Sequence, residues 1–316
     1  MGLKVFAGSA SQILATRICQ HLKIPLAKSQ TIKFGEGNIF VRVRENVRGQ
    51  DTFIVQTTSE PVNDNFMELL FWIDALKRAS AAQVTAVIPF FSYAKGDKKD
   101  EPRVSIRARV CADCIEAAGA DRVLTMDLHA AQIQGFFRIP VDHLYAMPVL
   151  ANHIRRRRLK NLCIVSPDIG FGKMARKYAD LLKADVAIGD KERLNHNEQA
   201  IMYHVIGDVK DKNVFIVDDM VLSGGTMIEI ADQLKQLGAR HIYAAATHGV
   251  FSNRCVERLE KSPIEEMVVT DTVPNGERLN SSRIRCVSVA KLFADAIRII
   301  HERRSMSRLF KRESMA

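Results

Sequence analysis

The 316-residue sequence contains no run of apolar residues approaching the roughly 20 that a membrane-spanning helix requires. Its first residues, MGLKVFAGSASQILATRI, include no basic segment followed by an uninterrupted apolar stretch, so we expect no secretory signal. These absences predict a cytoplasmic protein without a membrane partner. The rest of the composition, 47% hydrophobic and 26% charged, is that of an ordinary globular chain with room for about two domains.

The six cysteines are scattered, and the single CxxC at Cys111 and Cys114 has no second Cys or His pair at zinc spacing. Scattered thiols favour reduced, mostly buried cysteines over a disulfide framework. The pair lies in an expected helix, RVCADCIEAAGA. We therefore favour core packing, with metal or redox chemistry as the alternative.

The formal charge of +10 comes from basic residues spread along the chain, with no aromatic-interleaved recognition motif. We predict no nucleic-acid partner, because small anionic substrates account for the charge equally well. The densest basic runs are IRRRRLK at 154–160 and HERRSMSRLFKRE at 301–313. A solvated surface is the favoured interpretation of both, and oligomer contacts or effector phosphates are the alternatives.

Short β-branched runs alternate with amphipathic stretches along the whole chain, as in TFIVQT followed by NDNFMELLFWIDALKRAS. This alternation predicts an α/β fold with mostly parallel sheets flanked by helices. Both halves also contain a helix ending in Gly-Ala before a strand, and no low-complexity linker separates them. We predict two similar domains, residues 1–146 and 147–316, with ligands beyond the carboxyl ends of the strands.

The stretch IVDDMVLSGGT, residues 216–226, places two carboxylates and a small-residue loop between an apolar strand and a helix. Backbone N–H groups at a helix N-terminus suit a phosphate, and the paired Asp218 and Asp219 suit the hydroxyls of a sugar. The stretch lacks the lysine of GxxxxGK[ST], and GxGxxG is absent as well. It resembles the loop that binds 5-phosphoribosyl 1-diphosphate (PRPP) in phosphoribosyltransferases and ribose-phosphate pyrophosphokinases.

A second motif, DLHAAQIQGFFRIPVD at 127–142, separates these two families, because it closely resembles the signature of ribose-phosphate pyrophosphokinases (PRPP synthetases). The similarity extends over nearly the whole chain. It implies two phosphoribosyltransferase-like domains and the reaction of ATP with ribose 5-phosphate to give PRPP and AMP. It also implies magnesium as cofactor, dimers assembled into hexamers, and phosphate and ADP as effectors.

The resemblance assigns roles position by position. It makes His129 and Asp168 the magnesium ligands, and Lys191 and Arg193 the catalytic cations. The ribose 5-phosphate site that it implies consists of Arg193, Asp218, Asp219, Leu222, Ser223, Gly224, Gly225 and Thr226. The ATP site that it implies consists of Glu36, Gly37, Asn38, Lys95 and Gly96.

Four segments depart from the family pattern. FGEGN stands where the family has FSDGE, AKGD stands for ARQD, and LNHNEQ at 194–199 replaces a segment usually rich in arginine and proline. Leu222 replaces the aspartate that usually precedes the small residues of the loop, and we expect it to pack beneath the loop. Two alternatives therefore stay open: a weakly active or inactive regulatory paralogue that co-assembles with a PRPP synthetase, and a PRPP-consuming phosphoribosyltransferase.

Overall fold

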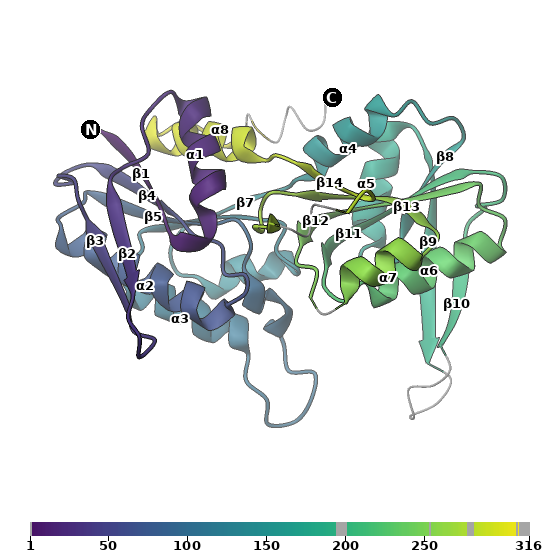
Figure 1. Cartoon of the computed structure of the whole chain (residues 1–316), viewed down its shortest axis with the longest axis horizontal. Coiled ribbons are helices and arrows are strands. Elements are labelled where there is room, and N and C mark those ends of the chain that lie inside the picture. The colour runs from purple at the N-terminus through teal and green to yellow at the C-terminus, as the bar shows by residue number, and fades with distance from the viewer. Residues whose placement is uncertain (1, 194–200, 253, 277–280, 308, 310–316) are drawn as a thin grey trace. The chain divides into compact units, whose positions relative to one another are not determined.

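The computed structural model of the chain describes residues 2–193, 201–252, 254–276, 281–307 and 309 (Figure 1). These residues form two compact units. The first contains the described residues within 1–145, 272–274 and 289–313, and the second those within 146–271 and 275–288. By packing, the described residues from Val289 onward thus belong with the amino-terminal unit.

The first unit is built on a parallel sheet with the strand order β1-β4-β5-β6-β7 in the described residues. Helices α2 and α3 pack on one face, while α1 and α8 lie side by side on the other (Figure 1). The sheet consists of β1 (Leu3–Ala7), β4 (Asp51–Val55), β5 (Gln83–Ile88), β6 (Arg122–Met126) and β7 (Val141–Leu144). The helices are α1 (Gln12–Leu22), α2 (Val62–Arg78), α3 (Arg107–Ala117) and α8 (Ala290–His301).

Helix α8 packs on the first unit, which buries its apolar face. Phe293 and Ile297 are fully buried, Arg298 Nη2 donates to the His21 carbonyl at 3.0 Å, and His301 Nδ1 lies 2.7 Å from Asp51 Oδ2. On the opposite face the single tryptophan, Trp72 of α2, is fully buried against Phe6. Burial of such large side chains is the dominant stabilising term of the unit.

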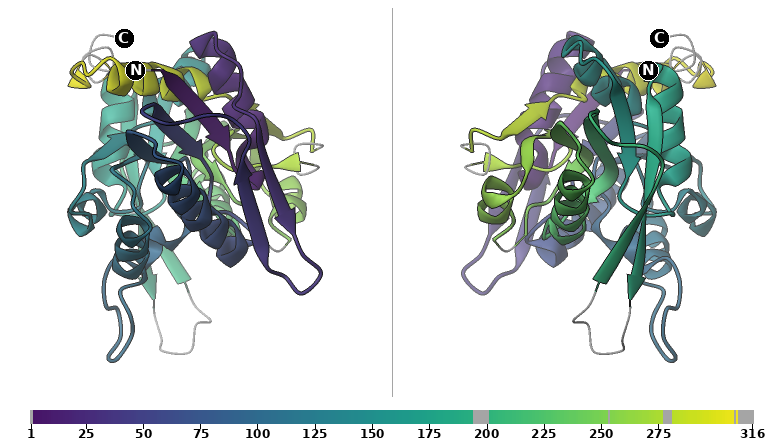
Figure 2. Two further views of the ribbon diagram at one scale, coloured as in Figure 1. Left: turned by 90° about the vertical axis from the view of Figure 1, so that its left-hand side faces the viewer. Right: turned by 90° about the vertical axis from the view of Figure 1, so that its right-hand side faces the viewer.

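Two further features complete the first unit. An antiparallel hairpin of β2 (Ser29–Lys33) and β3 (Ile39–Val43) stands apart from the five-stranded sheet (Figure 2). Short 3-10 helices follow three of the parallel strands, namely η1 (Ser9–Ser11), η2 (Ser92–Gly96) and η3 (Ala131–Phe136).

The second unit has a sheet in the order β10-β9-β8-β11-β12-β13-β14, parallel except for β10, within the residues described. Helices α4 and α5 cover one face, and α6 and α7 cover the other (Figure 1). Its strands are β8 (Leu162–Ser166), β9 (Asp185–Arg193), β10 (Ile201–Ile206), β11 (Asn213–Val221), β12 (His241–Gly249), β13 (Ile264–Thr270) and β14 (Ile284–Val287). Its helices are α4 (Met147–Arg156), α5 (Gly172–Leu182), α6 (Gly225–Gln236) and α7 (Cys255–Lys261).

These two units confirm the predicted fold class, an α/β chain with mostly parallel sheets flanked by helices. In the part of the chain that the structure describes, no helix is both long and apolar enough to span a membrane.

Candidate functional site

The paired carboxylates lie where β11 continues past its neighbour β8. Pairing between these strands ends at Ile216 with Val165, whereas β11 stays paired with β12 as far as Val221. Asp218 and Asp219 therefore belong to the part of β11 that has no β8 partner. This is the carboxyl edge of the sheet, where ligands of α/β proteins collect.

The electrostatics of the pair are unfavourable when both groups are ionised. Part of Asp218 keeps contact with solvent, but its carboxyl is surrounded so closely that burial raises its pKa well above the usual range. The charges of Asp219 and Asp168 raise the pKa of Asp218 further, and the Asp219 backbone N–H, which donates to Asp218 Oδ1 at 2.9 Å, opposes the rise. Donors or a cation at this place would relieve the repulsion.

Asp168 follows β8 at the same edge and has a structural task. Its Oδ1 accepts a hydrogen bond from the Phe171 N–H at 2.9 Å, which closes the turn before α5. Its backbone carbonyl accepts from Ser166 Oγ at 2.6 Å. The side chain is exposed, and its charge contributes to the raised pKa of Asp218.

The SGGT loop, residues 223–226, leads directly into the twelve-residue helix α6. Gly224 is the N-cap with φ +73°, a left-handed conformation that glycine adopts without strain, and a Cβ there would lie 2.9 Å from Cys255 Sγ. Among the described residues no side-chain hydrogen bond caps this helix, and its first backbone N–H groups form an end that carries partial positive charge. The arrangement suits an anion such as a phosphate.

Leu222 is half-buried at the end of β11. The core cluster on this side of the sheet is instead formed by its neighbours in sequence, including Val221 and Met227, together with Cys255 and Phe251. The prediction that the leucine packs beneath the loop thus finds no counterpart in that cluster.

Lys191 and Arg193 lie at the carboxyl end of β9, at the same edge as Asp168, because β9 runs parallel to β8. Strand β9 continues to Arg193. The reason is the antiparallel pairing with β10, in which Lys191 is opposite Tyr203 and Arg193 is opposite Ile201. The departing segment LNHNEQ, 194–199, lies outside the described residues.

His129 belongs to the first unit, in an exposed position after β6. The turn before it is held tightly: Asp127 has φ +37°, its N–H donates to the Leu144 carbonyl at 2.9 Å, and the Leu128 N–H donates to His143 Nε2 at 2.9 Å. His143 is buried, and its Nε2 accepts this hydrogen bond from the turn. His143 supports the turn that carries His129, and sequence reasoning overlooked it although it directly follows the 127–142 motif.

Lys95 and Gly96 lie in η2, after the neighbouring strand β5, so they share an edge of the sheet with His129. Lys95 is exposed and Gly96 is buried. A Cβ at Gly96 would lie 2.6 Å from Arg107 Nε and 2.9 Å from Arg107 Cβ. The side chain of Arg107 therefore occupies the space that a larger residue at position 96 would need.

The remaining ATP-site candidates, Glu36, Gly37 and Asn38, form the exposed turn of the β2–β3 hairpin, a different element from η2, which carries Lys95 and Gly96. Gly37 has φ +92°, and Asn38 Oδ1 accepts from the Ile39 N–H at 2.8 Å. The structure thus separates the five ATP-site candidates into two groups.

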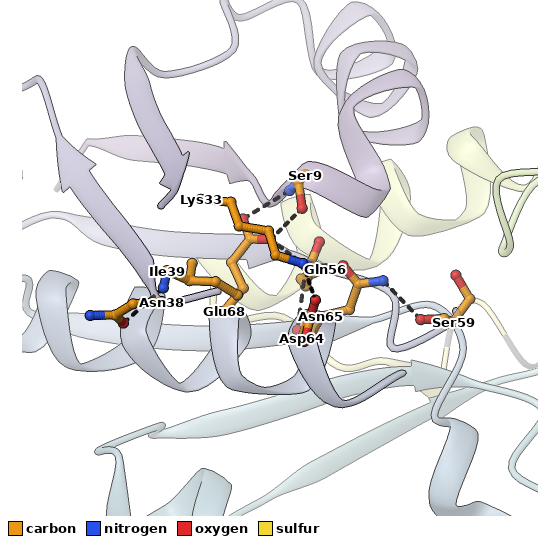
Figure 3. Close-up of polar contacts among 9 residues, drawn as sticks. All are labelled: Ser9, Lys33, Asn38, Ile39, Gln56, Ser59, Asp64, Asn65 and Glu68. Carbon is orange, nitrogen blue, oxygen red and sulfur yellow. Dashed lines mark hydrogen bonds and ion pairs between the residues drawn. The ribbon is translucent and has the colours of Figure 1, made fainter. Parts of the chain in front are cut away.

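A buried carboxylate that the sequence did not single out anchors this hairpin (Figure 3). Glu68 of α2 is 2% exposed and accepts hydrogen bonds from the Ser9 N–H at 2.9 Å, Thr31 Oγ1 at 3.0 Å, Gln56 Nε2 at 3.0 Å and Trp72 Nε1 at 3.2 Å, and also from Ser9 Oγ. At the surface, Lys33 Nζ pairs with Asp64 Oδ2 at 2.5 Å. Five donors around one carboxylate connect η1, β2 and the residue after β4 with α2.

Other features lie away from the candidate site. Two surface pockets, of about 540 Å³ beside Asp51 and Arg304 and about 420 Å³ beside Arg158 and Lys183, contain none of the residues that the resemblance assigns. The Cys111 thiol is buried, which raises its pKa to about 12, so it carries almost no thiolate at neutral pH. This favours core packing for the CxxC pair.

In the described part of the chain, no group of three or more His, Cys, Asp or Glu side chains converges as a metal site.

Comparison with known proteins gives consistent results along the chain. Residues 3–119 match the family model described as the N-terminal domain of ribose phosphate pyrophosphokinase, and residues 194–311 match the phosphoribosyl synthetase-associated domain. Curated relatives named ribose-phosphate pyrophosphokinase include those of Caldanaerobacter subterraneus, 49% identical over 309 residues, and Clostridium perfringens, 49% identical over 314 residues. In both cases the alignment covers 98% of each chain.

A solved structure gives the same result in three dimensions. The phosphoribosylpyrophosphate synthetase from Mycobacterium smegmatis superposes with a TM-score of 0.90 at 39% sequence identity, covering 96% of this chain and 100% of that chain. The resemblance drawn from the two motifs is confirmed, and the chain belongs to the ribose-phosphate pyrophosphokinase family.

Proposed function

We propose that this chain transfers the diphosphoryl group of ATP to the 1-hydroxyl of ribose 5-phosphate, giving PRPP and AMP. The observation that carries the proposal is the Asp218–Asp219 pair, one short loop before the uncapped N-terminus of α6, in a chain 49% identical over nearly its full length to named ribose-phosphate pyrophosphokinases. The acidic pair suits the hydroxyls of a sugar phosphate, and the loop suits its phosphate.

In this proposal the SGGT loop holds the 5-phosphate through its backbone N–H groups and the Ser223 and Thr226 hydroxyls. Asp218 and Asp219 accept hydrogen bonds from the ribose hydroxyls, which are neutral donors and therefore suit a carboxylate pair that repels a second phosphate. Both ends of ribose 5-phosphate are fixed before its 1-hydroxyl attacks. Such positioning converts a bimolecular step into an effectively intramolecular one.

The 1-hydroxyl attacks the β-phosphorus of ATP, the bond to the α-phosphate oxygen breaks, and AMP leaves. Negative charge spreads over the phosphoryl oxygens in the transition state, so the protein contributes mainly orientation and positive charge. Lys191 and Arg193 at the end of β9 are our candidates for that charge. Lys95, Gly96 and the Glu36–Asn38 turn are our candidates for holding ATP.

Asp168 of the second unit and His129 of the first are each a candidate ligand that would hold magnesium. The exposed Asp168 carboxylate and the raised pKa of Asp218 fit a hard cation, because a cation relieves the repulsion among these acids. When bound, magnesium would neutralise charge on the ATP phosphates, which commonly supply most of its other ligands together with water. We further propose a cytoplasmic homo-oligomer, with dimers assembled into a hexamer, and phosphate and ADP as effectors.

One assay tests the proposal: the purified chain is incubated with ribose 5-phosphate, ATP and magnesium, and AMP and PRPP are quantified. Equal amounts of the two products are expected. A chain that is silent alone but alters the kinetics of an authentic PRPP synthetase would instead be a regulatory paralogue. Consumption of PRPP only when a base is present would identify a phosphoribosyltransferase.

A further inference from the structure

The carbonyl groups that lead into the SGGT loop are all tied to one neighbouring segment, the described residues of 250–258. The Val221 carbonyl accepts from the N–H groups of Val250 at 3.0 Å and Phe251 at 3.2 Å. The Leu222 carbonyl accepts from the Ser252 N–H at 3.0 Å. The next carbonyl, that of Ser223, accepts from a side chain, Nη1 of Arg258 at 3.1 Å.

This pattern matters for an anion at the loop. A carbonyl oxygen carries partial negative charge and repels a phosphate, whereas the N–H groups attract it. Three successive carbonyls that are occupied by donors from the 250–258 segment are held toward that segment. The loop N–H groups then stay available to a ligand at the start of α6.

The same segment also sets the loop conformation. Cys255 is fully buried, and its Sγ would lie 2.9 Å from a Cβ at Gly224, so α7 contacts the loop as closely as glycine permits. Arg258 follows one turn later on α7. Its guanidinium donates to the last of the three carbonyls, that of Ser223.

Arg258 also places a positive charge near the N-terminus of α6, which itself carries partial positive charge. A Cβ at Gly225 would lie 3.8 Å from Arg258 Nη2, 3.6 Å from Ser223 Oγ and 3.9 Å from Glu229 Oε1, so these groups surround the first residue of α6. A guanidinium at a helix N-terminus opposes the helix dipole. A phosphate bound there would satisfy both the guanidinium and the helix end.

We propose that Arg258 is a positioning residue for the 5-phosphate of ribose 5-phosphate. It fixes the Ser223 carbonyl toward α7 and places positive charge beside the loop. This role rests on the proposed assignment of the loop to the 5-phosphate. It predicts an effect on the phosphate end of the sugar substrate and none on ATP.

The test compares Arg258→Ala and Arg258→Lys with the control Arg254→Ala, which removes an equal charge from the exposed Arg254 just before α7. The KM for ribose 5-phosphate should rise about tenfold in Arg258→Ala, as expected for loss of one hydrogen bond to a charged group. The KM for ATP should stay within about twofold. The lysine variant should recover part of the loss, because lysine retains the charge but loses the planar fork.

Calorimetric titration with ribose 5-phosphate, without turnover, should show the same rise in Kd and no change for Arg254→Ala. Unchanged ribose 5-phosphate binding in Arg258→Ala would overturn the inference and leave the proposed function standing, and so would an equal rise in both KM values. A wild-type chain that forms no PRPP would overturn the proposed function, while the titration would still decide the role of Arg258.

Discussion

Asp218 is the residue whose ionisation most clearly destabilises the folded chain. Burial and the neighbouring Asp219 raise the pKa of its carboxyl, so the folded chain favours the protonated form. The free energy of unfolding that the protonated carboxyl contributes is fully present below the pKa of Asp218 in the unfolded chain. It is lost as pH rises through the raised pKa of the folded chain. Asp218→Asn should therefore have a higher thermal midpoint than the wild type at neutral pH, and the gain should disappear in acid.

Thermal unfolding of both proteins between about pH 4, near the ordinary pKa of aspartate, and pH 8 measures this difference. The same variant should lose PRPP synthesis, as expected when a functional site carries strain. A neutral-pH midpoint at or below that of the wild type would show that the buried charge does not oppose folding.

Lys191 is the residue on which the proposed chemistry depends most. If its ammonium stabilises charge on the transferred group, Lys191→Ala should lower kcat about 100-fold or more while leaving ribose 5-phosphate binding nearly unchanged. The exposed Lys235, at the far end of α6 from the SGGT loop, provides a charge-matched control. Normal turnover of Lys191→Ala would remove this lysine from the mechanism.

The two adjacent glycines of the loop should behave differently. Gly224→Ala forces alanine into φ +73° and against Cys255 Sγ, which should cost about 1–3 kcal/mol and lower the thermal midpoint by several degrees. At Gly225 the nearest atom to a new Cβ is 3.6 Å away, so Gly225→Ala should leave stability within about 0.5 kcal/mol. Equal losses in the two variants would show that the backbone conformation at Gly224 is not the constraint.

At the scale of elements, Glu68 determines how the β2–β3 hairpin and α2 hold together. Glu68→Gln keeps the size of the side chain but places an amide N–H₂ among groups that are themselves donors. We expect a loss of about 2–3 kcal/mol in the free energy of unfolding, measured by urea denaturation. Glu101→Gln, on an exposed loop of the same unit, should change little, and equal losses would contradict the account.

The alternation of strands and helices was predictable because each element carries its own apolar period. β4 and β11 appear as continuous apolar runs, since strands of a parallel sheet are buried on both faces. The β2–β3 hairpin was not predicted, because its strands are only partly buried and lack that pattern. The packing of α8 with α1 was not predictable either. The sequence of α8 indicates an apolar face, but it does not indicate which unit covers that face.

At the scale of the whole molecule, sequence motifs located the acidic pair and the SGGT loop, because their residues are contiguous. They could not reveal Arg258, whose contact with Ser223 spans 35 residues, nor Glu68, whose donors include Ser9, Thr31 and Gln56 from distant parts of the sequence. A side chain that acts through distant partners has no local signature. The roles assigned to His129, Asp168, Lys191 and Arg193 stay predictions, and Lys191→Ala tests one of them.

The central claim is that β- and γ-phosphates of ATP move together to ribose 5-phosphate. It is tested most directly with ATP labelled at the β-phosphorus, magnesium and ribose 5-phosphate, followed by separation of the products. The account predicts that all transferred label appears in PRPP, matched by an equal amount of unlabelled AMP. Label recovered in ADP, or label that stays in ATP while the folded chain binds ribose 5-phosphate, would contradict it.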